Sequence, residues 1–197
     1  MKKLALSLIC LFTIALSQDD MNDDMGMKVY IGASSMSASG SSTYWEVVDP
    51  GRTIGFNIGL MKPINEKVTV GAGYTKRGWT DESYWVDFDA NIDEEWDISG
   101  IELWATYNLF NFSNGGNFWV GPSYAILTNV DLEMTNIDNG ISVSVDDDID
   151  DNDLSLMLGV SFPFGSNFLN VGYQRSLMKV DDTFLLNQFF IDYSFGL

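Results

Sequence analysis

The chain has 197 residues, a formal net charge of −18, no histidine and a single cysteine, Cys10. Such an excess of acid excludes a surface adapted to nucleic acid or to anionic lipid head groups. A single cysteine excludes a disulfide within the chain.

Residues 1–17 have the pattern of a secretory signal peptide. Two lysines precede an apolar run, Leu4–Leu16, which ends in small residues suited to cleavage just before Gln18. The run is too short for a membrane-spanning helix, and no later segment has about 18 consecutive apolar residues. We therefore predict an exported protein in which 1–17 is removed, 18–25 is an acidic N-terminal segment and 26–197 is the folded domain.

Eight segments of the remaining sequence alternate between apolar and polar residues with a period of two. This is the pattern of β-strands with two different faces. The segment 53–60 is the clearest, with Ile54, Phe56, Ile58 and Leu60 separated by small or polar residues. The eight predicted strands are 27–34, 53–60, 67–77, 100–109, 118–127, 154–162, 169–176 and 184–195. Since no segment has a sustained helical period, the fold class is all-β.

The connections between these strands alternate between short and long. The segments 61–66, 111–117 and 164–167 are short and rich in Gly, Asn, Pro and Ser, whereas the other connections are acidic and mostly longer. An up-and-down meander puts all the short turns at one end. The sequence therefore predicts an eight-stranded antiparallel up-and-down transmembrane β-barrel with short periplasmic turns and long acidic extracellular loops.

A soluble eight-stranded barrel or sandwich is the alternative, because alternation alone requires only one apolar face. A soluble barrel would fill its polar face with Lys, Glu and Arg. Here that face is mainly Gly, Ser, Thr and Asn, which suit a narrow and crowded lumen. The apolar face has almost no charge in its central part, as contact with hydrocarbon requires. The pattern favours lipid as the surroundings of the apolar face.

The signal peptide, the eight amphipathic segments, the asymmetry of turns and loops, and a last strand ending Tyr193-Ser194-Phe195 resemble one family. This is the small outer-membrane β-barrel superfamily of OmpX-, OmpA-barrel- and OmpW-like proteins. The acidic, Asn- and Asp-rich style is similar to barrel domains of Bacteroidota-type bacteria. The resemblance implies the outer membrane of a Gram-negative bacterium, with membrane lipid and the outer-membrane assembly machinery as partners. It includes no catalytic or binding motif.

The C-terminal segment also resembles the signal that the assembly machinery reads. Gln188 matches its polar position, Tyr193 its hydrophobic position and Phe195 its terminal aromatic. The segment departs from that pattern at Phe190, where glycine is usual, and at the two residues that follow Phe195.

Catalysis is not expected. Outer-membrane barrel enzymes resemble one another in using a histidine as base or as part of the active site, and this chain has none. We therefore predict a protein that is no enzyme and has no cofactor.

Four charged residues are predicted to face the lumen. The alternation directs Lys28, Glu102 and Asp192 inward, and we expect a Lys28–Asp192 pair where the first and last strands meet, with Arg77 and Glu102 as a looser second pair. Paired charges could form an ion path or a structural plug. The plug is favoured because eight strands leave little room for a water channel.

The third long connection contains a predicted hairpin at 130–145. Asn139-Gly140 is a type I′ turn signal between two alternating runs. Val130, Leu132 and Met134 can then share a face with valines of the returning run. The edge of this hairpin is available to an extracellular protein partner. Because the turn pairs even with odd positions, a bulge is expected within 146–153.

The acidic run that follows suggests divalent cations. Asp146, Asp148, Asp150 and Asn152 are candidate ligands, and three of them have the spacing that opens an EF-hand loop. The glycine and the final glutamate of such a loop are missing. The hypothesis is therefore weak calcium or magnesium binding by acidic loops, against a solvated acidic surface.

These features predict a structural or surface-interaction role, such as adhesion or envelope maintenance. The alternative is a narrow pore or conduit for small solutes or hydrophobic molecules. A lumen closed by Trp104, Trp119, Phe190 and paired charges would favour the first role. A continuous lumen would favour the second.

Overall fold

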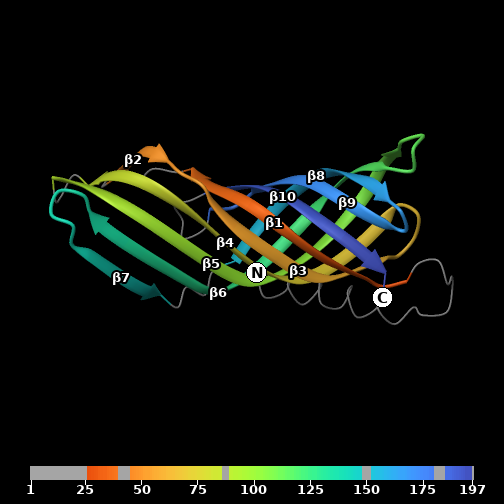
Figure 1. The fold of residues 1–197 in the computed structure, drawn as a ribbon, viewed down its shortest axis with the longest axis horizontal. Coiled ribbons are helices and arrows are strands. Elements are labelled where there is room, and N and C mark those ends of the chain that lie inside the picture. The colour runs from red at the N-terminus through yellow and green to blue at the C-terminus, as the bar shows by residue number, and fades with distance from the viewer. Residues whose placement is uncertain (1–25, 40–44, 86–88, 148–151, 180–184, 197) are drawn as a thin grey trace.

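A closed antiparallel β-barrel, extended at one end by a curved sheet, forms the structure (Figure 1). The computed structural model describes residues 26–39, 45–85, 89–147, 152–179 and 185–196. The predicted signal peptide and the segment 18–25 lie outside the described residues. Within those ranges, no helix is long and apolar enough to cross a membrane.

Eight strands close the barrel, as the alternation predicted, and each pairs with its neighbours in an antiparallel register. The first and last strands meet, with Lys28 opposite Gly196. The chain therefore enters and leaves the barrel on the side of the short turns. Around the ring the strands are β1 (Lys28–Ser39), β3 (Thr53–Pro63), β4 (Val68–Trp85), β5 (Ala90–Asn111), β6 (Asn117–Asn136), β8 (Asn152–Phe164), β9 (Asn167–Ser176) and β10 (Leu185–Gly196).

The outer face of the barrel is apolar and exposed. Ile54, Phe56, Ile58 and Leu60 of β3 all point outward, with Ile58 45% exposed. The same holds for Phe189 and Ile191 on the last strand. A water-soluble protein does not leave an apolar belt of this extent uncovered. The belt identifies the lipid-facing surface, and the strands cross the bilayer there.

Three strands continue well beyond the barrel at the end opposite the turns (Figure 1). These are β4, β5 and β6, which stay paired up to Trp85–Ala90 and Ile92–Asn136. Two further strands add to their edges: β2 (Trp45–Pro50) pairs with β4, and β7 (Ser142–Asp147) pairs with β6. The result is a sheet in the order β2-β4-β5-β6-β7, called here the extracellular sheet.

The sequence analysis treated most of 78–99 as an acidic loop, and this was wrong. Residues 78–85 of β4 are paired with residues 90–97 of β5. Charge excludes a strand only where its face meets lipid. Beyond the membrane both faces can be polar, and there the pairing of β4 with β5 continues without a break.

The predicted hairpin at 130–145 is present, with a different turn. Leu132 lies opposite Val145 and Met134 opposite Val143, so these residues share a face as expected. The turn has four residues between Asn136 and Ile141 instead of two. The Asn136 side chain accepts from the backbone N–H groups of two of them, and Gly140 takes the left-handed conformation with φ of 67°. An asparagine that caps the loop therefore replaces the expected type I′ turn.

The register on β6 shifts where the bulge was expected. Val130 of β6 pairs with Asp147, and Ile126 pairs with Asn152. Four residues on β6 thus correspond to five along the chain from β7 to β8, and residues 148–151 lie outside the described residues. This shift brings β8 into the barrel with its even residues facing lipid.

Candidate functional site

A buried ion pair crosses the middle of the lumen. Arg77 of β4 and Asp153 of β8 each have side chains only 1% exposed, with 3.7 Å between the guanidinium and carboxylate groups. Arg77 also donates to Gln188 of β10 at 2.6 Å, and Ser155 donates to Asp153 at 2.8 Å. These four residues, called here the ion-pair layer, therefore connect strands from opposite sides of the barrel.

Glu102 lies in a neighbouring polar cluster. Its carboxylate accepts from Ser123 and from Gln174, both at 2.7 Å, and all three residues are buried. The predicted Arg77–Glu102 pair is therefore corrected to Arg77–Asp153. The register explains why: Arg77 lies opposite Ile98 and Glu102 opposite Gly73, four residues or about 13 Å apart along the strand.

The predicted Lys28–Asp192 pair is corrected in the same way. Lys28 lies opposite Gly196, whereas Asp192 lies opposite Gly32. The ammonium group of Lys28 sits over the ring of Phe168, 4.4 Å from its centroid. Asp192 instead accepts a short hydrogen bond from Asn57 of β3.

An apolar cluster closes the lumen on the extracellular side of the ion-pair layer. Its members come from β1, β4, β5, β6 and β10, and the ring of Trp79 stacks on Trp96 at 5.1 Å. The cluster consists of Met36, Ala38, Trp79, Ile98, Ala125, Leu127 and Leu186. Together with the Arg77–Asp153 pair, these buried side chains fill this part of the lumen.

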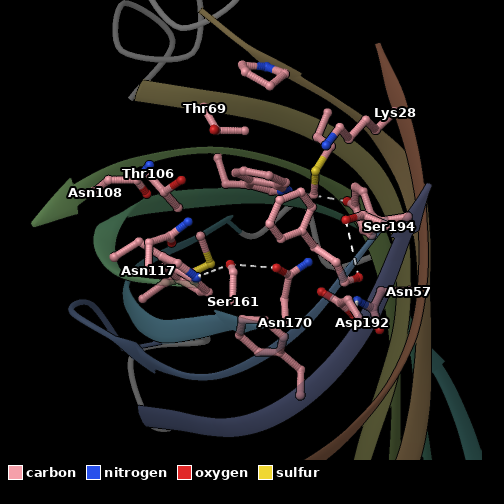
Figure 2. Close-up of a pocket in the computed structure, with 18 of the residues that line it drawn as sticks. Lys28, Asn57, Thr69, Thr106, Asn108, Asn117, Ser161, Asn170, Asp192 and Ser194 are labelled. Atoms are coloured by element: carbon pink, nitrogen blue, oxygen red, sulfur yellow. Dashed lines mark hydrogen bonds between the residues drawn. The ribbon is translucent and has the colours of Figure 1, made fainter. Parts of the chain in front are cut away.

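A cavity of about 480 Å³ occupies the other half of the lumen (Figure 2). It reaches from Gln174 and Gln188, next to the ion-pair layer, to Asn65 and Glu66 in the exposed turn between β3 and β4. We call it the turn-end pouch, because it opens at the short turns and ends at the ion-pair layer.

Aromatic rings cover the walls of this pouch. Each of three rings lies against a glycine of a neighbouring strand, where a Cβ atom would collide with it. The pairs are Trp104 over Gly71, Trp119 over Gly159 and Phe190 over Gly172. Larger residues at these glycines would push the rings into the lumen. The glycines of the polar face therefore create the space, and the three rings line this part of the lumen without closing it.

The outer face of the extracellular sheet carries opposed negative charges. Glu82 lies opposite Asp93, and Glu95 lies opposite Glu133, so like charges face each other across neighbouring strands. Such pairs are destabilising. The sequence has no Lys or Arg between Arg77 and Arg175 to neutralise them. We call Glu82, Asp93, Glu95 and Glu133 the acidic patch; they border a second cavity.

The inner face of the same sheet holds two buried carboxyl groups. Asp81 and Glu94 are each 5% exposed. Glu94 accepts hydrogen bonds from Ser83 and from the indole N–H groups of Trp85 and Trp96, at 2.7, 2.8 and 3.2 Å. Burial, and then the negative charge of Glu94, raise the pKa of Asp81 to about 7.

The comparisons with known proteins concern the fold. Neisserial surface protein A matches with a TM-score of 0.56 at 14% identity, covering 87% of this chain and 97% of its own. Ail of Yersinia pestis, in a complex with the heparin analogue sucrose octasulfate, matches with a TM-score of 0.50 at 16% identity, covering 87% and 99%. The chain has the fold of a small outer-membrane β-barrel protein. No family model and no curated protein sequence matches it.

In this outer-membrane barrel the predicted assembly-signal residues have different surroundings. Gln188 is buried in the lumen and accepts from Arg77. Tyr193 lies near the turn end, where its hydroxyl accepts from Asn167 at 2.6 Å, and its ring is 6.1 Å from that of Phe195. Recognition of these residues by the assembly machinery stays a prediction.

The divalent-cation hypothesis also stays a prediction. Asp148 and Asp150 lie outside the described residues, Asp146 lies on β7 opposite Asp131, and Asn152 begins β8. Within the described ranges, no group of three or more acidic side chains is arranged to hold a metal ion.

The sequence analysis missed Asp153 as a lumen residue. It was grouped with the acidic connection that precedes β8, yet it has the same parity as Ser155, Met157 and Ser161, which all face inward. This parity was the available signal. Tyr30, Asn57 and Gln174 were overlooked because uncharged residues on a polar face do not stand out.

The carboxyl pair of the extracellular sheet predicts a pH-dependent signal. Because the pKa of Asp81 is raised above its ordinary 3.8, the folded sheet binds a proton between about pH 4 and pH 7 that the unfolded chain does not. Stability of the sheet therefore falls as pH rises through about 7. Since indoles bind both carboxyls, tryptophan fluorescence should titrate with a midpoint near pH 7.

Asp81→Asn should abolish this transition, whereas Asp138→Asn, in the loop between β6 and β7, should leave it unchanged. A midpoint near pH 4 in the unsubstituted protein, or one that persists in Asp81→Asn, would contradict the assignment.

Proposed function

We propose that this barrel lies in the outer membrane of a Gram-negative cell and acts there as a non-catalytic surface-interaction protein. In this proposal, the extracellular sheet binds an extended, cationic segment of an external polypeptide. The observation on which it rests is the acidic patch, where like charges lie opposite one another on neighbouring strands.

The acidic patch supports a cationic partner energetically. Opposed carboxylates weaken the pairing of β4, β5 and β6, because each pair repels. A partner that brings Lys or Arg to this face would remove that repulsion and gain the attraction of several carboxylates at once. A positively charged partner would also be steered toward the sheet at low ionic strength.

The edge of β7 supports an extended partner. Among the described strands, β7 pairs with β6 alone, so the backbone groups of its outer edge are available. An added strand would satisfy these groups by β-augmentation. Exposed Ile141 and Val143, at 60% and 52%, give it an apolar contact next to the turn.

The charge of this chain points away from the type of ligand in the Ail complex. Sucrose octasulfate is a polyanion. An acidic patch without Lys or Arg would repel it, so similarity of fold to Ail does not extend to that ligand. The conduit alternative receives no support either, because the ion-pair layer and the apolar cluster interrupt the lumen.

The proposal is tested by binding of an oligolysine peptide to the protein in zwitterionic lipid vesicles. The variant Asp93→Asn/Glu95→Gln/Glu133→Gln should bind about tenfold more weakly, as expected for three exposed charge contacts. Binding to the unsubstituted protein should weaken as salt rises.

A charge-matched control separates the patch from overall acidity. Asp89→Asn/Asp138→Asn/Glu66→Gln removes the same number of carboxylates at the hairpin tip, the β6–β7 loop and the opposite end of the barrel. It should retain nearly full binding. Equal losses in the two variants would show bulk attraction only and would overturn the proposed site.

A further inference from the structure

We infer that the turn-end pouch is a binding site for a small organic ammonium ion with an apolar body, entering from the periplasmic side. The inference concerns the lumen and is independent of the proposed role of the extracellular sheet. It rests on the pouch's shape, its aromatic walls and its excess of hydrogen-bond acceptors.

The pouch is a cavity that is closed at its inner end. Its volume of about 480 Å³ lies in the range of small-molecule sites. Gln188, which accepts from Arg77 of the ion-pair layer, lines its inner end, and the turn between β3 and β4 borders its mouth. Because the inner end is closed, a solute that enters is held and does not pass through.

The walls favour a cation. Trp104, Trp119 and Phe190 each lie against a glycine of a neighbouring strand. Their rings therefore border the space that a ligand would occupy. The faces of aromatic rings attract cations, most strongly when water is excluded. At the mouth, the ring of Phe168 already receives the ammonium group of Lys28.

The polar groups favour a cation that donates hydrogen bonds. Asp192 and Glu102 both line the pouch, and each is 8% exposed. The side-chain oxygens of Asn57 and Asn117 are buried there without a hydrogen-bond partner. An unpaired buried acceptor costs free energy until a donor meets it. A protonated amine supplies both the donors and the charge.

The positively charged side chains near the pouch do not cancel its preference for a cation. Lys28 is the one cation among the described residues that line the pouch, and it sits near the mouth over Phe168. Arg77 lies outside the lining and faces Asp153 and Gln188. The two carboxyl groups therefore lie deeper in the pouch than its lysine, with aromatic rings beside them.

Three probes with one aromatic body test the inference: phenethylamine, phenethyl alcohol and phenylacetate. Each is titrated into the full-length protein in detergent, with quenching of tryptophan fluorescence and titration calorimetry as readouts. The amine should bind saturably with 1:1 stoichiometry and at least about tenfold more tightly than the alcohol, and phenylacetate should bind most weakly.

The variant Asp192→Asn keeps the shape of the side chain and should reduce amine affinity to that of the alcohol. The matched control, Asp138→Asn in the β6–β7 loop, should leave it unchanged. If Asp192→Asn does not fold, Glu102→Gln serves instead, with the same expected direction. No saturable amine binding, equal affinity for the three probes, or equal losses in variant and control would each overturn the inference.

Discussion

Replacing Arg77 by methionine is expected to lower the free energy of unfolding of the barrel by about 3–5 kcal/mol. The substitution leaves the Asp153 carboxyl group buried, with its side chain 1% exposed, and removes the guanidinium that pairs with it. It also leaves the Gln188 side-chain oxygen without its donor. Urea titration of the protein in phosphocholine vesicles measures the loss.

Two variants make this prediction specific to the buried pair. Arg77→Met/Asp153→Asn should recover most of the lost stability, because a neutral amide still accepts from Ser155 and needs no counter-charge. Lys76→Met removes the neighbouring cation, whose pair with Asp97 at 3.0 Å is about half exposed. It should change stability by less than about 1 kcal/mol. If Lys76→Met lowers the free energy of unfolding as much as Arg77→Met does, burial of the ion pair is not the cause of the loss.

Ile58→Arg is expected to destabilise the protein by about 2–4 kcal/mol in a bilayer. Ile58 lies near the middle of β3 on the outer face of the barrel, where an arginine would meet hydrocarbon. The folded fraction, seen as heat-modifiable migration on unboiled gels, should fall, and the urea midpoint should shift downward.

The chain provides a matched control for this effect. Ile137 is 46% exposed, against 45% for Ile58, but it lies in the loop between β6 and β7. Ile137→Arg should leave stability within about 0.5 kcal/mol of the unsubstituted protein. Equal effects of the two substitutions, or a protein soluble without detergent, would contradict the lipid-facing assignment.

Alternation predicted the barrel ring because each membrane-crossing strand has one face in lipid and one in the lumen. Ile54, Phe56, Ile58 and Leu60 therefore identified β3 and its orientation directly. The same rule failed for β4 and β5 beyond the membrane, where acidic residues such as Glu82 and Glu95 lie in paired strands. Outside lipid, charge does not mark the end of a strand.

The charge pairs could not be predicted, because they depend on register between strands far apart in the sequence. Lys28 and Asp192 both face the lumen, yet the β1–β10 register separates them by four residues. Arg77 and Asp153 lie on β4 and β8, which are not neighbours in the ring. Only the closed barrel brings their side chains together across its interior.

The absence of Lys and Arg from 78–174 has a practical consequence for detecting this protein on cells. Trypsin cleaves after these residues, so it cannot cut any part of β5, β6, β7 or β8, however well the extracellular sheet is exposed. Surface shaving with trypsin would release no peptide from within this region, and amine-reactive labels would find no side chain to modify there. A protease that cleaves after glutamate would reach Glu82, Glu95 and Glu133 instead.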